Sequence, residues 1–180
     1  MQRALKTVRY LREDGWRPVV LTADPRGYEA TTDSQLAEIP DDVPVRRAFC
    51  LDAKRHFAIG GSYPGFLAWP DAWITWYPFA VAAGRRLIRE QQPAIIWSTF
   101  PISTANLVAR NLSQWSGLPW IADLRDPMTL DGYPPERMRY RLVRRVERST
   151  MRHAAQVVFT AEYTRRIYTE RYPGISGKTA

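Results

Sequence analysis

The chain has 180 residues, of which 45% are hydrophobic and 24% charged, the composition of an ordinary globular domain. A chain of this length buries about 70% of its unfolded surface and needs no disulfide to fold, and its single cysteine, Cys50, excludes an intrachain disulfide. One cysteine and two histidines, His56 and His153, are too few for a zinc site of the Cys/His kind, so we expect no metal. The net charge of +8 indicates an anionic partner, which could be nucleic acid, lipid or nucleotide.

The first segment of the chain has the pattern of an amphipathic helix. Within residues 2–14, Leu5, Val8 and Leu11 recur at the spacing of one helical face, and Gly15 follows at the usual position of a helix end. This stretch lacks the apolar run of a signal peptide.

Further along, short apolar runs alternate with amphipathic stretches. The apolar runs predict buried strands at residues 18–22, 94–98, 118–123 and 156–159, and a short strand is expected around residues 45–50 after a turn. The amphipathic stretches predict helices at residues 71–92, 101–117, 134–153 and 161–171. We expect loops at residues 57–69 and 174–180. Residues 57–84 are poor in charge, but Pro64, Pro70 and Pro78 interrupt them, so we expect no membrane-spanning helix.

This alternation predicts an α/β fold, a Rossmann-like parallel sheet with helices on both faces. Such folds usually open with a strand that becomes the centre of the sheet, whereas this chain opens within a helix. We therefore expect that the chain lacks its first strand and is a piece of a larger protein.

Ligands of open parallel sheets bind beyond the carboxyl ends of the strands. At one of these ends, two carboxylates flank a guanidinium in the order Asp123, Arg125, Asp126, which suits hydroxyls or phosphate oxygens. The alternative is a structural Asp–Arg clamp that holds the loop.

A second strand end places Ser98 and Thr99 just before a predicted helix start that carries Ser103 and Thr104. Hydroxyls and free N–H groups at a helix start can bind anions or sugar hydroxyls. Simple capping of the helix is the alternative reading of this pattern.

Several enzyme classes lack support in the sequence. No G-x-G-x-x-G follows a predicted strand, and neither a P-loop nor a G-x-S-x-G elbow with a His-based triad is present. A dehydrogenase, a P-loop ATPase and a serine hydrolase are therefore not supported.

The helix predicted at residues 134–153 is strongly basic. Seven arginines and two glutamates lie between residues 136 and 152, so five of the eight net positive charges are local. We expect contact with an anionic membrane or another anion for the arginines at the middle of this helix: Arg141, Arg144, Arg145 and Arg148. The alternative is that these arginines form a solvated helix face. The aromatic residues between positions 69 and 79 also allow two interpretations, packing in the core or a lipid-facing patch.

Several of these segments resemble, in consistent order, the N-terminal domain of family 4-like glycosyltransferases. The resemblance covers about residues 2–172 and includes residues 70–71, 97–101 and 155–160. Its most specific part is Pro-Trp-Ile-Ala-Asp-Leu-Arg-Asp-Pro at residues 119–127, after which Met128 stands where the family usually has an aromatic residue.

The resemblance implies a GT-B fold, in which two Rossmann-like domains face each other across a cleft. Residues 1–172 would be the N-terminal, acceptor-side domain, and residues 173–180 a loop leading to a C-terminal domain. That second domain would bind most of the nucleotide-sugar donor, which is a co-substrate, so no cofactor is expected. The residues implied to line the acceptor side of the cleft are Ser98, Thr99, Asp123, Arg125 and Asp126.

We therefore expect the acceptor-binding part of a retaining, nucleotide-sugar-dependent glycosyltransferase that is inactive as these 180 residues alone. The expected pathway is synthesis of cell-envelope polysaccharide or glycolipid, in the cytoplasm or peripherally on the inner face of the membrane. The expected partners are a sugar or glycolipid acceptor and an anionic membrane surface, without nucleic acid. The alternative is a basic membrane-docking module without catalysis.

Overall fold

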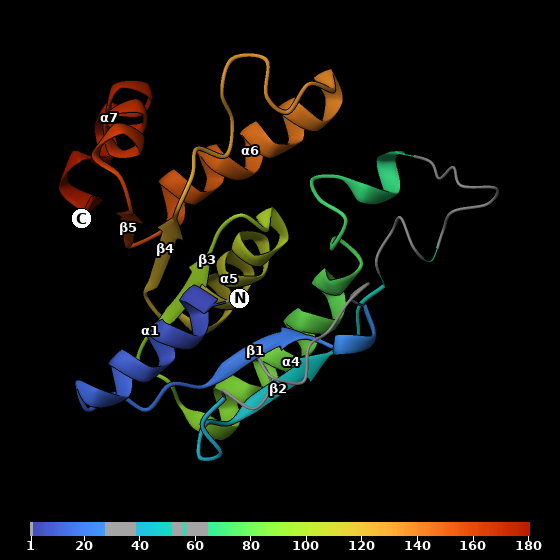
Figure 1. Cartoon of the computed structure of the whole chain (residues 1–180), viewed down its shortest axis with the longest axis vertical. Helices are drawn as coiled ribbons and strands as arrows, with labels where there is room; N and C mark the ends of the chain where they lie inside the picture. The colour runs from blue at the N-terminus through green and yellow to red at the C-terminus, as the bar shows by residue number, and fades with distance from the viewer. Residues whose placement is uncertain (1, 28–38, 52–55, 57–64) are drawn as a thin grey trace.

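The computed structural model describes residues 2–27, 39–51, 56 and 65–180. Helices and strands alternate as expected (Figure 1). In chain order they are α1 (Gln2–Glu13), β1 (Val20–Ala23), β2 (Val45–Ala48), α4 (Trp76–Gln91), β3 (Ile96–Thr99), α5 (Ser103–Ser116), β4 (Trp120–Leu124), α6 (Arg137–His153), β5 (Gln156–Phe159) and α7 (Glu162–Arg171). Short 3-10 turns lie at Pro25–Gly27, Gly65–Ala68 and Pro173–Lys178.

The described strands form two parallel sheets. β1 pairs with β2, while β4 lies between β3 and β5 in the second sheet. Parallel sheets flanked by helices confirm the predicted α/β class, the Rossmann-like architecture of one half of a GT-B fold.

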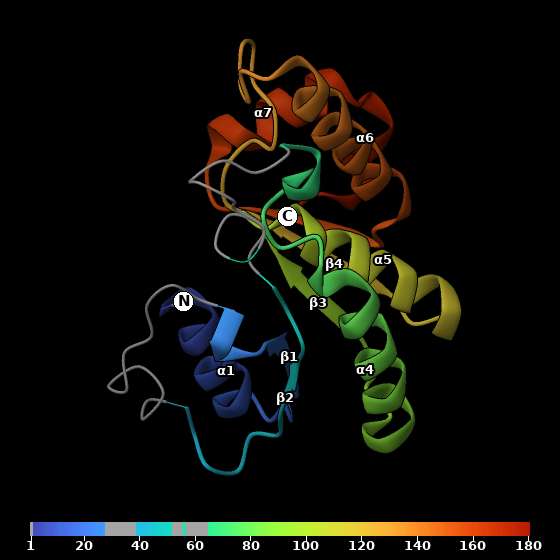
Figure 2. The same cartoon turned by 90° about the vertical axis from the view of Figure 1, so that its right-hand side faces the viewer.

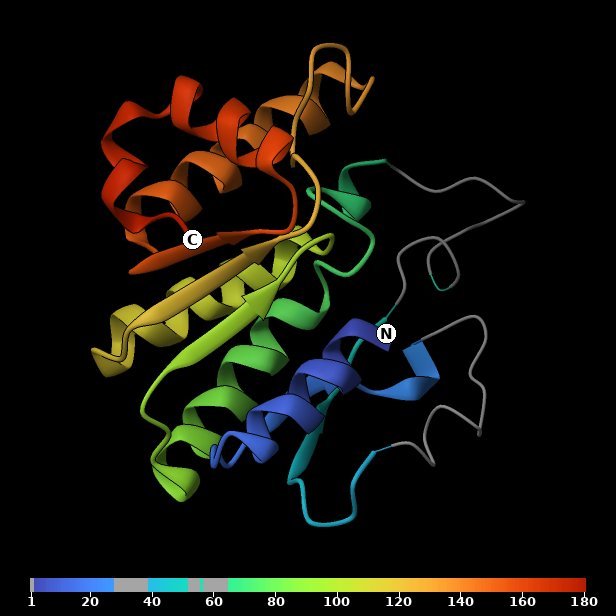
Figure 3. The ribbon, with the colours of Figure 1, turned by 60° about the vertical axis from the view of Figure 1, so that its left-hand side comes forward.

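Helices lie on both sides of the first sheet. Figure 2 shows α1 and α4 on opposite sides of β1 and β2. On the second sheet, Trp120, Ala122 and Leu124 of β4 share a core with Val143 and Val146 of α6. These strand residues alternate with Ile121 and Asp123, whose side chains point to the opposite face. In Figure 3 the second sheet lies in front of α5, and its other face is turned toward the viewer.

A second core joins the two sheets through α4 and α5. It contains Ala23 of β1, Ala48 of β2, Ala80 of α4 and Leu112 of α5. The two helices approach closely at Gly84, where a Cβ would lie only 2.5 Å from Cδ1 of Leu112. The helix pair therefore needs glycine at this crossing point.

Several predicted boundaries differ from the structure by a few residues, and two of the differences have a specific structural cause. The helix predicted from residue 71 begins at Trp76, because the carboxylate of Asp71 accepts a hydrogen bond from the Trp73 backbone N–H and holds a turn instead. The predicted loop at residues 174–180 is partly ordered structure, since its 3-10 turn is followed by Ala180, whose backbone pairs with Val157 and Phe159 of β5. The predicted loop at residues 57–69 lies mostly outside the described residues.

The outer edges of β1 and β3 have no strand beside them in the described part of the chain. The doubly wound order would place one more strand between these two edges. α1 would pack near such a strand, and no side chain between residues 4 and 13 is buried. The expected additional strand remains a prediction, with which this geometry agrees.

We predict weak hydrogen-exchange protection at these edges. The β1–β2 and β3–β4 hydrogen bonds use alternate residues, which leaves the amides of Leu21 and Trp97 directed away from the neighbouring strand. These amides and those of α1 should exchange about a hundredfold faster than the amide of Ala122 in β4, equivalent to about 2.7 kcal/mol of local stability. Equal protection of Trp97 and Ala122, measured by NMR, would show that the edge is covered.

Candidate functional site

The carboxyl ends of β3 and β4 bring two of the predicted site residues together. Thr99 and Asp123 are register partners, and the Thr99 hydroxyl donates to Oδ2 of Asp123 over 3.0 Å. The backbone N–H of Phe100 donates to the Asp123 carbonyl over 2.9 Å. The side chain of Asp123 is almost fully buried. Asp123 therefore lies buried at the carboxyl ends of β3 and β4.

Ser98 points the other way, because neighbouring side chains of a strand lie on opposite faces. Its buried hydroxyl donates to Oδ1 of Asn106 over 2.8 Å and accepts from Nε1 of Trp120 over 2.8 Å. Both partners lie in the helix-covered core, so the structure places Ser98 apart from Thr99 and Asp123.

Arg125 and Asp126 follow β4 and are exposed. The Arg125 carbonyl accepts from the Thr160 hydroxyl over 2.9 Å, which ties this loop to the end of β5. Within the described residues no ion pair joins Arg125 to Asp123 or Asp126. The expected alternative of an Asp–Arg clamp is therefore not formed, and both exposed side chains face solvent.

Beside Asp126 lies a cavity of about 250 Å³. Its apolar lining includes Phe100, Met128 and Val143. Its polar lining consists of Asp71, Ser103, Asp126, Tyr133 and Arg139. The lining thus combines apolar side chains with hydrogen-bond acceptors and donors, the usual make-up of a small-molecule site.

Asp71 is the member of this lining whose role the sequence did not reveal. Its carboxylate accepts from the Thr104 backbone N–H over 2.8 Å and from the Thr104 hydroxyl over 2.9 Å. It thereby caps α5, whose own N-cap residue, Ile102, makes no side-chain capping bond. Burial raises the pKa of Asp71, and the hydrogen bonds from Thr104 and Trp73 oppose that shift. The apolar residue Ile102 at the N-cap position was the one feature of the sequence that could have indicated that another segment caps α5.

Ser103 and Arg139 supply donors to the cavity. Ser103 is 3% exposed and lines the cavity at the first turn of α5. Arg139 reaches from the first turn of α6, and its Nε donates to the Pro70 carbonyl over 3.3 Å. Together with the acceptors Asp71 and Asp126, they suit a ligand that has several hydroxyl groups. In the described part of the chain no group of three His, Cys, Asp or Glu residues could hold a metal ion.

The loop that carries Asp126 is anchored by a buried carboxylate. Glu147 of α6 is fully buried, and Oε2 accepts from the Thr129 hydroxyl over 2.6 Å and from the Tyr168 hydroxyl over 3.2 Å. The Tyr172 hydroxyl donates to Oε1 over 2.8 Å. These bonds join α6 to α7 and to the loop after β4.

Two guanidinium groups are the remaining partners of the Glu147 carboxylate. Arg144 forms a short ion pair with Oε1, and Arg171 donates to the same oxygen over 3.0 Å. Arg171 also donates to the Thr129 carbonyl over 3.0 Å. The sequence suggested Arg144 for anion contact, and this role stays a prediction; in the structure the guanidinium of Arg144 pairs with Glu147.

Met128, at the position where the resemblance leads one to expect an aromatic residue, is enclosed by the core. Its side chain is 1% exposed within the core of β4 and α6. Its backbone N–H donates to the Tyr168 hydroxyl over 2.8 Å, and its sulfur lies 4.0 Å from Nδ2 of Asn106. A flexible thioether fills this irregular gap without strain.

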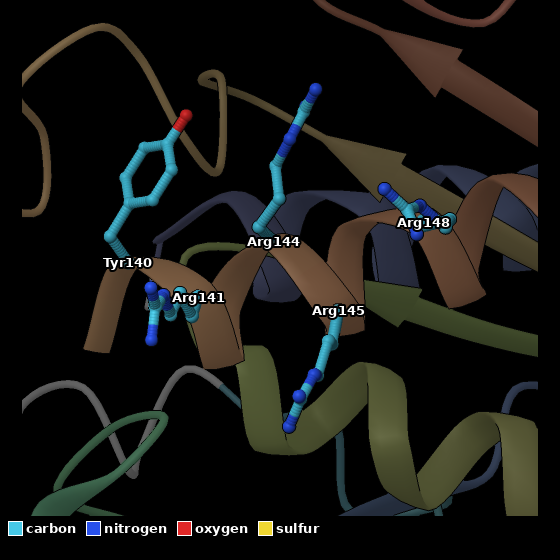
Figure 4. Close-up of a pocket in the computed structure, with 5 residues that line it drawn as sticks. All are labelled: Tyr140, Arg141, Arg144, Arg145 and Arg148. Carbon is cyan, nitrogen blue, oxygen red and sulfur yellow. The ribbon is translucent and has the colours of Figure 1, made fainter. Parts of the chain in front are cut away.

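The remaining arginines of the basic helix lie on its outer face. Arg141, Arg145 and Arg148 are exposed and, together with Tyr140 and Arg144, line a shallow hollow of about 330 Å³ (Figure 4). The hollow lies on the opposite side of α6 from Val143, which lines the cavity beside Asp126. These are two separate features of the same helix.

The fold and the strand-end cavity define a Rossmann-like α/β domain of the kind that forms half of a GT-B glycosyltransferase. Residues 2–175 match the family model of the glycosyl transferase 4-like domain, and the chain belongs to this family. It is therefore a glycosyltransferase domain whose substrates are a nucleotide-sugar donor and a sugar or glycolipid acceptor. No curated protein matches the chain. In the described part, no helix has the length and apolar character needed to span a membrane.

We predict that Glu147→Gln destabilises the protein by about 3–5 kcal/mol, because it leaves Arg144 and Arg171 without their buried counter-charge. Urea unfolding followed by circular dichroism measures this change. Glu162→Gln is the matched control and should cost far less stability, since Glu162 forms an exposed i,i+3 pair with Arg165. Equal losses in the two variants would contradict the anchoring role of Glu147.

We also predict a loss of stability at alkaline pH. Burial, together with Glu147, raises the pKa of Tyr168 and of Tyr172 above the usual value of 10.0. Above about pH 10 the unfolded chain releases these protons while the folded protein retains them, so stability falls by up to about 1.4 kcal/mol per pH unit for each tyrosine. Tyr172→Phe should reduce this slope by the contribution of one proton relative to the unmodified chain. Urea unfolding between pH 9 and 11 tests this.

Proposed function

We propose that this domain holds the acceptor of a nucleotide-sugar-dependent glycosyltransferase in the cavity beside Asp126. The observation that carries the proposal is the presence in one cavity lining of the acceptors Asp71 and Asp126 and the donors Ser103 and Arg139, at the carboxyl ends of β3 and β4. Family membership supplies the transferase activity, and the cavity supplies a place for one of its two substrates.

The charges in the cavity favour a hydroxyl-bearing ligand over an anion. The amino end of α5 would attract an anion, but the carboxylate of Asp71 already occupies the Thr104 N–H. Asp126 adds a second negative charge at the rim, and Arg139 a positive one. A sugar, whose hydroxyls both donate and accept, satisfies this mixed lining.

In this proposal, Asp126 accepts a hydrogen bond from an acceptor hydroxyl and orients it, which lowers the barrier through positioning. Arg125, at the same strand end, offers positive charge to the cleft, while the hydrogen bond between Thr99 and Asp123 joins the neighbouring ends of β3 and β4. Ser98 is left out, because its hydroxyl is engaged in the core. The donor would be bound mainly by a second Rossmann-like domain.

The finer expectations from the sequence belong to the same proposal. They are retention of anomeric configuration, a role in cell-envelope polysaccharide or glycolipid synthesis, and a cytoplasmic location at the inner face of the membrane. A membrane-docking module without catalysis remains the alternative hypothesis. We expect the 180-residue chain by itself to release no UDP from UDP-glucose, and detectable release would contradict this part.

Binding of simple glycosides tests the site. In ¹H–¹⁵N NMR titrations with a panel of methyl hexosides, we expect shifts at Ser103, Asp126 and Arg139. Asp126→Asn, which keeps the size of the side chain, should weaken binding about tenfold, the loss of one charge-assisted hydrogen bond of about 1.5 kcal/mol. The control is Asp131→Asn, because Asp131 is exposed in the same loop outside the cavity lining. Shifts confined to another surface, or equal affinity in both variants, would contradict the proposal.

A further inference from the structure

We propose that the outer face of α6 docks on an anionic lipid bilayer. This face carries five arginines, which we call the arginine stripe. They are Arg137, Arg141, Arg145, Arg148 and Arg152. Their spacing of four, four, three and four residues keeps them on one side of an α-helix over about 22 Å.

The core fixes the orientation of this stripe. Val143, Val146, Thr150 and Met151 are buried on the opposite side of α6. The five stripe arginines are all exposed. α6 therefore cannot turn the stripe inward without exposing its share of the core.

The stripe arginines are also uncompensated. Among the described residues none of the five forms an ion pair, whereas Arg139 pairs with Glu136 and Arg144 with Glu147. Like charges four residues apart destabilise a helix, so the stripe represents a repulsion that a negatively charged partner would relieve.

The shape of the face suits a flat, extended partner. Figure 4 shows Tyr140 and Arg144 extending to one side of α6 and Arg145 to the other, with Arg141 and Arg148 between them. The hollow that these side chains line is shallow and open, unlike a pocket that encloses a small anion. A surface that runs along the helix can contact all five stripe arginines at once.

Exposed apolar side chains at one end of the stripe favour a bilayer over a nucleic acid. Met138 is 47% exposed and Tyr133, in the loop just before α6, is 57% exposed. A bilayer offers an apolar layer directly beneath its charged surface, into which such side chains insert. The phosphate surface of a nucleic acid offers no such layer.

The docking surface and the cavity meet at the amino end of α6. Tyr133 is exposed and also lines the cavity beside Asp126. If that cavity binds the acceptor, as proposed above, a docked domain would receive an acceptor attached to a lipid. This consequence rests on the proposed function, whereas docking itself does not.

Vesicle co-sedimentation tests the docking. We expect the chain to bind vesicles of equal parts phosphatidylglycerol and phosphatidylcholine and to dissociate from them as the salt concentration rises. We expect no binding to vesicles of pure phosphatidylcholine. Each cation near an anionic surface contributes about fivefold to partitioning. The triple variant Arg141→Gln, Arg145→Gln, Arg148→Gln should therefore partition about a hundredfold more weakly.

A charge-matched control separates the stripe from net charge. Lys6→Gln, Arg17→Gln, Arg47→Gln removes three exposed cations from the first 50 residues and should bind vesicles nearly as well as the unmodified chain. Circular dichroism confirms that both triple variants remain folded. Equal binding of the two variants, or no binding of the unmodified chain, would overturn the proposal.

Two further measurements distinguish the remaining outcomes. Met138→Ser should weaken vesicle binding several-fold, whereas affinity for duplex DNA that exceeds vesicle affinity at equal salt would overturn the bilayer as partner. Asp126→Asn should retain full vesicle binding, because the vesicles contain no sugar acceptor. Failure of glycoside binding together with intact docking would refute the proposed function alone.

Discussion

The buried carboxylate of Glu147 is the interaction on which the position of the candidate site depends. Removing a carboxylate from water costs several kcal/mol unless its oxygens are satisfied. Here the hydroxyls of Thr129 and Tyr172 and the guanidinium groups of Arg144 and Arg171 satisfy them. Because these partners come from three separate segments, the carboxylate holds α6, α7 and the loop after β4 in one arrangement.

The same constraint links the two functional features of the domain. The loop held through Thr129 begins at Asp126 and thus forms one wall of the cavity. The side of α6 that carries Glu147 is buried, so the arginines on the opposite side must face outward. The contacts of Glu147 therefore contribute both to one wall of the proposed acceptor cavity and to the orientation of α6.

Asp71 plays the corresponding role on the other wall. It ends the turn before α4 and caps α5, so that Ser103 is held at the cavity. Arg139 connects the two walls, since it extends from α6 to the Pro70 carbonyl beside Asp71. The cavity is built by contacts between elements, and no single segment contains it.

The sequence by itself determined the order and type of the elements and the family, because these depend on local periodicity and on the run at residues 119–127. It also placed Thr99 and Asp123 at strand ends that proved to be neighbours. Only the tertiary structure decided that Ser98 points into the core, that Asp71 caps a helix 33 residues away, and that Arg144 belongs to Glu147. Each of these depends on which side chains of distant segments meet in the folded chain, and the spacing within one segment carries no information about that.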